Sequence, residues 1–138
     1  MGTSVMKRLM AAIAPEQDRE LARRPAPGVD ELAIHGFIAE KGAIRIGRLV
    51  RQICDPRGAW LATSPLDDPA ALGDAAIRAP DEAARVGRAL VDAGYFGPFG
   101  VDAYLYRDAR GQTSLQPRSE INARFSMGYA VGMPDDER

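Results

Sequence analysis

The strongest constraint on the fold is a pair of alternating segments in the second half of the chain. Apolar and polar side chains alternate over residues 99–106, and a second such segment at 113–123 follows the sequence Asp-Ala-Arg-Gly at 108–111. A period of two places successive side chains on opposite faces of a strand. Aspartate and glycine favour the tight turn of a hairpin. The sequence therefore predicts an antiparallel β-hairpin over 99–123 with one apolar face.

The middle of the chain predicts further strands. Residues 44–46 and 49–53 are rich in isoleucine, valine and leucine, which is typical of strands. The sequence Asp-Pro-Arg-Gly at 55–58 has the residues of a tight turn, so the chain is expected to return as a strand over 59–63. Residues 64–79 lack a clear period and are expected to form a loop.

One helix is predicted before the hairpin, over residues 80–93. Pro80 suits the first turn of a helix, and Asp81 and Glu82 follow it where negative charge interacts favourably with the helix dipole. Gly94 is expected to end the helix. The expected fold class is therefore α+β, with an antiparallel sheet and flanking helices.

The chain is expected to consist of one domain between two short ends. Residues 1–28 contain apolar residues at helical spacing and close with Arg-Pro-Ala-Pro-Gly, which is typical of a linker. Residues 134–138 are polar and are expected to fray. We therefore expect an N-terminal helical segment and linker at 1–28, a single domain at 29–133 and a polar tail at 134–138.

Charge and rare residues exclude several classes of function. The formal net charge is −1 and the arginines are spread along the chain, so nucleic acid is not an expected partner. Cys54 and His35 are the only cysteine and histidine, which rules out an internal disulfide and a thiolate cluster for zinc. Residues 1–14 are too polar for a membrane span. A cytoplasmic location without membrane partners is expected.

The predicted hairpin gathers oxygen-bearing side chains on one face. Asp102, Glu120 and Asn122 are expected to lie opposite the apolar face that contains Ile121. Regular pairing brings Asp102 roughly opposite Arg118 and diagonal to Glu120, within reach of side chains. Two carboxylates and an amide oxygen suit a hard divalent cation that keeps positions open for water and phosphate oxygens, which points to a nucleoside triphosphate. The alternative is ordinary polar residues on the solvent side of an amphipathic hairpin.

Two sequences around this hairpin resemble the closing motifs of the ATP-grasp superfamily. They are Gly-Tyr-Phe-Gly-Pro-Phe-Gly-Val-Asp-Ala-Tyr at 94–104 and Glu-Ile-Asn-Ala-Arg-Phe-Ser-Met-Gly at 120–128. In that family a glycine and a strand aspartate are followed, one hairpin later, by Glu-x-Asn. The likeness runs from about residue 87 to residue 128. It implies the C-terminal half of an ATP-grasp fold, from a carboxylate–amine ligase.

The resemblance implies roles for individual residues. Asp102, Glu120 and Asn122 match the family's metal ligands, which hold two Mg²⁺ ions between the β- and γ-phosphates of ATP, with Mn²⁺ as an alternative. Asn122 is thereby also expected to contact the bound nucleotide. In such enzymes the γ-phosphoryl group moves to a substrate carboxylate, and an amine then attacks the acylphosphate. The implied ligands are ATP, a small carboxylate and an amine.

Three further residues are candidates for catalysis or ATP binding. Arg124 is the candidate catalytic residue for the phosphate or the acyl intermediate, with a surface ion pair as the alternative. D-alanine–D-alanine ligases often have an arginine two residues before the strand aspartate. Gly100 stands there in this chain, so that role is expected to pass to Arg124 or Arg118. Glu40 lies in a stretch that resembles the family's hinge strand and is a candidate for the ribose, with a solvated strand end as the alternative.

The length of the chain departs from the family. A complete ATP-grasp enzyme has a substrate domain and a subdomain whose lysines contact the phosphates, whereas this chain has 138 residues and only Lys7 and Lys41. We therefore expect the metal- and ATP-phosphate-binding half of a ligase, completed by an N-terminal lobe or by homo-oligomerisation. Two alternatives stay open, namely a non-catalytic binding or assembly module with this fold, and a plain oxygen-ligand metal-binding domain.

Overall fold

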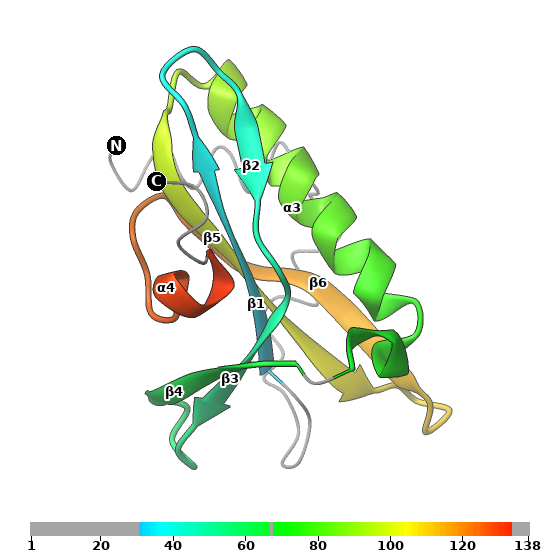
Figure 1. Ribbon diagram of the computed structural model, residues 1–138. Helices are drawn as coiled ribbons and strands as arrows, with labels where there is room; N and C mark the ends of the chain where they lie inside the picture. Colours follow the sequence, from blue (N-terminus) through cyan, green and yellow to red (C-terminus); the bar gives the residue numbers. More distant parts are fainter. Residues whose placement is uncertain (1–30, 67, 134–138) are drawn as a thin grey trace.

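Six antiparallel strands form one sheet in the computed structural model, which describes residues 31–66 and 68–133 (Figure 1). The strands are β1 (Glu31–Ile38), β2 (Ile44–Ile46), β3 (Val50–Cys54), β4 (Trp60–Pro65), β5 (Gly97–Arg107) and β6 (Thr113–Asn122). The helices are the short 3₁₀ helix η2 (Pro69–Leu72), α3 (Ala75–Asp92) and α4 (Tyr129–Gly132). The predicted α+β class with an antiparallel sheet is confirmed. The predicted helical segment at 1–28 and the tail at 134–138 lie outside the described residues.

Strand β1 lies at the centre of the sheet, in the order β4-β3-β1-β5-β6. It pairs with β5 along its whole length, and on its other edge with β3 near its start and β2 near its end. All of its residues except Glu31 and Phe37 are buried, as a strand covered on both faces requires. The two short strands predicted at 44–46 and 49–53 are confirmed as β2 and β3, with Gly47 between them. Its N–H donates to the His35 carbonyl at 2.7 Å between the two shorter strands.

Helix α3 packs against one face of the sheet and encloses the main core. Its buried residues Ala83, Val86 and Leu90 belong to the same cluster as Ile34 and Phe99 from the strands. Figure 1 shows α3 running along the sheet beside β2 and β6. None of the helices in the described part of the chain is long and apolar enough to cross a membrane.

Helix α3 begins earlier than the sequence predicts. It starts at Ala75, and Pro80 lies inside it rather than at its first turn. An interior proline removes a backbone hydrogen bond and costs about 3 kcal/mol. Ala75 and Ala79 are buried in the core, and we attribute the longer helix to this packing. The predicted loop at 64–79 is therefore wrong in its last part, and η2 occupies another part of it.

Both predicted turns are confirmed, and aspartate side chains stabilise them. Oδ1 of Asp55 accepts hydrogen bonds from the N–H groups of Arg57 at 2.8 Å and Ala59 at 2.9 Å. Oδ1 of Asp108 likewise accepts from the N–H groups of Arg110 at 2.9 Å and Gln112 at 3.0 Å. These side chains close the β3–β4 and β5–β6 connections, as turn-forming aspartates do.

The sheet face opposite α3, called the second face below, is partly covered by residues 123–133. Nε2 of His35 on this face lies 3.1 Å from the Met127 carbonyl oxygen, and the Tyr129 ring meets the imidazole edge-on. Gly128 has a φ of 85° and lies so close to Thr63 that a β-carbon would collide with it. This stretch, called the returning segment below, therefore shelters part of the second face.

Candidate functional site

The β5–β6 hairpin places Asp102 directly opposite Glu120. Near the turn the strands pair regularly, with Tyr104 opposite Gln116. Between these two pairs β5 has one residue and β6 has three, so β6 carries a bulge. The sequence predicts Asp102 opposite Arg118 and diagonal to Glu120. The bulge shifts the register by two residues, and Glu120 takes the place that Arg118 would occupy.

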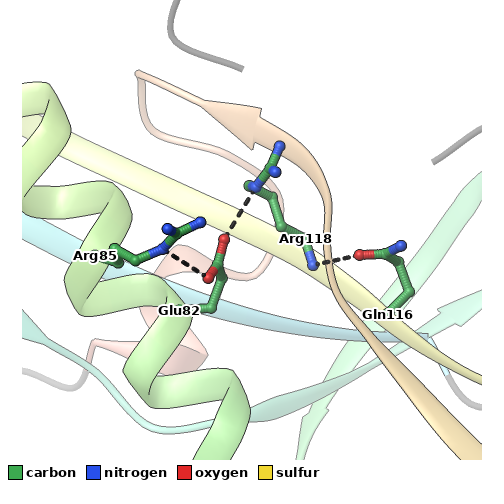
Figure 2. A network of polar contacts seen from close by, with 4 residues as sticks. All are labelled: Glu82, Arg85, Gln116 and Arg118. Atoms are coloured by element: carbon green, nitrogen blue, oxygen red, sulfur yellow. Dashed lines mark hydrogen bonds and ion pairs between the residues drawn. The ribbon is translucent and has the colours of Figure 1, made fainter. Parts of the chain in front are cut away.

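Arg118 lies on the opposite face from the one predicted. Its fully buried side chain lies between β6 and α3, where Nε donates to Oε2 of Glu82 at 3.0 Å (Figure 2). Its backbone N–H donates to Oε1 of Gln116 at 3.2 Å. The alternation that predicts Arg118 beside Glu120 fails because a bulge interrupts the period of two. The expectation that Arg118 shares the nucleotide-facing side of the hairpin is therefore wrong.

Asp102 and Glu120 form a hydrogen-bonded pair of carboxyl groups on the second face. The pKa of Asp102 is raised from its ordinary value of 3.8 to about 7, first by burial and then by the hydrogen bond to Glu120. The negative charges of Glu120 and Glu31 raise this pKa as well, whereas the charge of Arg124 lowers it. Two acids directly opposite each other repel unless a proton or a cation lies between them. Near neutral pH about half of the Asp102 carboxyl groups carry a proton, and the protonated form donates a hydrogen bond to Glu120.

Asn122 and Arg124 extend this arrangement along the hairpin. Asn122 lies opposite Gly100, one step from the acid pair and on the same face as Glu120. Nη2 of Arg124 donates to the Asn122 amide oxygen at 3.1 Å, and Nη1 donates to the Phe125 carbonyl at 3.2 Å. The predicted gathering of Asp102, Glu120 and Asn122 on one face is therefore present, with an exposed guanidinium beside it.

Glu31 and Cys54 adjoin the acid pair, and the sequence does not reveal this. The Cys54 thiol donates a hydrogen bond to Glu31, whose charge also acts on Asp102. Burial first, then this hydrogen bond and the charges of Glu31, Asp102 and Asp55, raise the pKa of Cys54 to about 11. The thiol is therefore protonated at neutral pH and is no nucleophile. Glu31 reaches Asp102 only through the pairing of β1 with β5, which no local pattern encodes.

Glu40 lies far from the other candidates. It is exposed in the turn after β1, whereas Asp102 is opposite Ala33 near the start of the same strand. Seven residues of extended chain separate Ala33 from Glu40, roughly 20 Å at the usual rise per residue. A ribose in contact with Glu40 would therefore lie at the opposite end of the sheet from Asp102. This contact stays a prediction.

His35 is buried on the second face, where its ring contacts Met127, Tyr129 and Gly132. Because a carbonyl oxygen only accepts, Nε2 carries the proton and donates to Met127 at 3.1 Å. Nδ1 has no hydrogen-bond partner among the described residues and lies against Gly132. Burial lowers the pKa of His35, with the Met127 hydrogen bond acting in the opposite direction. The imidazole anchors the returning segment and has no free face for general-base chemistry.

Oxygen-bearing side chains of Asp102, Glu120 and Asn122 gather on the second face. The part of the chain that the structure describes contains no group of three or more histidine, cysteine, aspartate or glutamate side chains arranged to hold a metal ion. Asp102, Glu120 and the amide of Asn122 would need water or phosphate oxygens to complete a coordination shell. The chain matches no protein-family model and no curated protein.

Proposed function

We propose that this chain supplies the metal- and ATP-phosphate-binding half of an ATP-dependent carboxylate–amine ligase. The observation that supports the proposal best is the Asp102–Glu120 carboxyl pair, with Asn122 one step further along the same face. The three residues have the order and spacing of the ATP-grasp closing motifs that the sequence resembles. The α+β architecture with an antiparallel sheet is compatible with a C-terminal ATP-grasp subdomain, which is the finer fold assignment proposed here.

The chemistry of the acid pair fits a divalent cation. Asp102 and Glu120 are held directly opposite each other, and a proton on Asp102 relieves the repulsion between the two carboxyl groups. A divalent cation would replace that proton favourably, because carboxylate oxygens are the ligands that Mg²⁺ and Mn²⁺ prefer. Mg²⁺ tolerates an incomplete protein cage when phosphate oxygens and water supply the remaining ligands. Such an ion neutralises the charge that develops during phosphoryl transfer.

Arg124 is the catalytic candidate at this site. Its guanidinium is exposed beside Asn122 and acts electrostatically on Asp102. Arginine binds phosphate and acylphosphate oxygens through paired N–H groups. In the proposed reaction Arg124 leaves the Asn122 amide oxygen free for the cation and turns to the phosphate. Arg118 takes no part in nucleotide binding under this proposal, because it is buried beneath α3.

The proposed activity requires a second lobe. Lys41 is exposed beside Glu40 at the end of the sheet that lies far from Asp102. An N-terminal lobe or a second copy would have to provide the lysines that contact the phosphates and the sites for the small carboxylate and the amine. We place the assembled enzyme in the cytoplasm, where ATP and magnesium are available.

Manganese titration of the full chain at pH 8, followed by electron paramagnetic resonance with and without a non-hydrolysable ATP analogue, tests the proposal. Asp102→Asn and Glu120→Gln should each weaken Mn²⁺ binding by about tenfold or more. Asp92→Asn, which removes an exposed carboxylate on α3, is the matched control and should bind as wild type does. The analogue should tighten Mn²⁺ binding.

Three outcomes separate the alternatives. Failure of the wild-type chain to bind Mn²⁺ under any of these conditions contradicts the proposal. Equal Mn²⁺ affinity with and without the analogue favours a plain metal-binding domain. A melting temperature that saturating Mg²⁺ and ATP leave unchanged, even with a candidate N-terminal lobe present, favours a non-catalytic module.

A further inference from the structure

The β5–β6 hairpin changes its register at the bulge between Tyr104 and Asp102. Continuing the regular pairing of Tyr104 with Gln116 without interruption would place Asp102 opposite Arg118. The structure instead has Asp102 opposite Glu120. Opposite charges across a strand pair are favourable and like charges are unfavourable. Local electrostatics therefore favour the regular register, and an interaction elsewhere must select the observed one.

The buried ion pair of Arg118 with Glu82 provides that interaction. Figure 2 shows the guanidinium directed from β6 to the carboxylate on α3, with Nε donating to Oε2 at 3.0 Å. Glu82 also accepts from Nε of Arg85 at 3.2 Å, through its other oxygen. Arg118 is fully buried, whereas Arg85 is half exposed. Removing one partner of a buried pair is strongly destabilising, so Arg118 is held on the helix side of the sheet.

The residues of the bulge suit this arrangement. Pro117 has no N–H to lose where the ladder is interrupted, which is why proline is tolerated at bulges. The Gln116 side chain accepts the Arg118 N–H at 3.2 Å, so this backbone donor keeps a partner inside the sheet. Pro117 and Gln116 thus reduce the free-energy cost of the bulge. The ion pair with Glu82 decides that the Arg118 side chain lies on the face of the sheet that α3 covers.

We infer that Arg118 and Glu82 are positioning residues, whose ion pair selects the hairpin register that sets Glu120 opposite Asp102 and Asn122 opposite Gly100. In the regular register Arg118 would neutralise Asp102, and Glu120 would face Gly100 instead. No carboxyl pair would then form. The role in building a cation site rests on the proposed function, whereas the selection of the register does not.

Nuclear Overhauser contacts between β5 and β6, measured on the full chain, test the inference. In Glu82→Gln the guanidinium of Arg118 loses its carboxylate, and contacts of Asp102 with Glu120 should give way to contacts of Asp102 with Arg118. Affinity for Mn²⁺ should fall by about tenfold or more. Arg85→Gln removes the exposed partner of the same carboxylate. As the matched control, it should keep both the register and the affinity.

A second variant separates register selection from simple stability. Glu82→Gln combined with Arg118→Met replaces the ion pair by an uncharged pair that α3 can cover. It should restore the contacts between Asp102 and Glu120, because methionine favours the buried side and can no longer pair with Asp102. If Glu82→Gln alone does not fold, the contacts in this double variant show whether the ion pair selects the register.

Two results overturn the inference. One is a folded Glu82→Gln chain with wild-type interstrand contacts and wild-type Mn²⁺ affinity. The other is a folded double variant in which Glu120 no longer contacts Asp102. A wild-type chain that binds no Mn²⁺ refutes the proposed function instead, and the interstrand contacts still decide whether the ion pair selects the register.

Discussion

Replacing Asp102 by asparagine should stabilise the fold at alkaline pH when no divalent cation is present. The pKa of Asp102 is raised from 3.8 to about 7 in the folded chain. Well below pH 3.8 the carboxyl group is protonated in both the folded and the unfolded chain, so it contributes nothing to the pH dependence of stability. Between pH 3.8 and 7 the unfolded chain releases the proton while the folded chain retains it, so stability falls as the pH rises. Well above pH 7 the folded chain carries the full free-energy penalty of the ionised Asp102.

The size of this penalty follows from the pKa difference. A difference of about 3, at about 1.4 kcal/mol per pKa unit, gives a ceiling of about 4 kcal/mol. Burial is the first cause of the raised pKa, and a polar asparagine at the same buried position also loses hydration, so part of that penalty survives the substitution. We therefore expect Asp102→Asn to gain about 1–3 kcal/mol over wild type at pH 8. The gain should vanish near pH 4.

Urea denaturation in the presence of a chelator, at pH values from 4 to 8, measures this difference. Asp92→Asn serves as the control and should stay within about 0.5 kcal/mol of wild type, as exposed substitutions do. Under the proposed function, adding Mn²⁺ at pH 8 should stabilise wild type more than Asp102→Asn, because the proposed cation site loses one of its two carboxylates in that variant. A gain that does not change with pH, or a loss of stability at pH 8, would refute the reasoning.

Four further predictions concern other parts of the fold. Phe99→Ala should cost about 3–5 kcal/mol in chemical denaturation, because the ring is fully buried in the cluster beneath α3. Gly128→Ala should cost about 1–3 kcal/mol, because its φ of 85° is strained for alanine and the new methyl group would collide with Thr63; loss of the Met127 contact with the His35 imidazole, seen by NMR, would locate the effect. Burial lowers the pKa of His35, so this residue stabilises the fold above pH 6.5 and loses that contribution as the pH falls; in matched denaturation series His35→Leu should lack this fall. The Cys54 thiol, with a pKa of about 11, should react slowly with a disulfide reagent at pH 8 in the folded chain and quickly in urea, and rapid reaction of the folded chain would contradict the assigned surroundings.

The two turns and the hairpin strands could be read from the sequence because they depend on neighbouring residues. Asp55 and Asp108 cap their own turns within four residues, and alternation within β5 assigns Val101 and Asp102 to opposite faces. The shared face of Glu120 and Asn122 follows from the same period. Their roles in binding ATP and metal stay a proposal, because spacing predicts proximity and not a ligand.

Only the tertiary structure decided how these local elements meet. The start of α3 at Ala75 depends on packing in the core, which overrides the preference of Pro80 for a first turn. Glu31 joins the acid pair through a partner strand that is distant along the chain. The register that puts Glu120 opposite Asp102 depends on a contact between Arg118 and Glu82, which are 36 residues apart. A strand pattern fixes which side chains can share a face, but a bulge held by a distant carboxylate fixes which of them stand opposite each other.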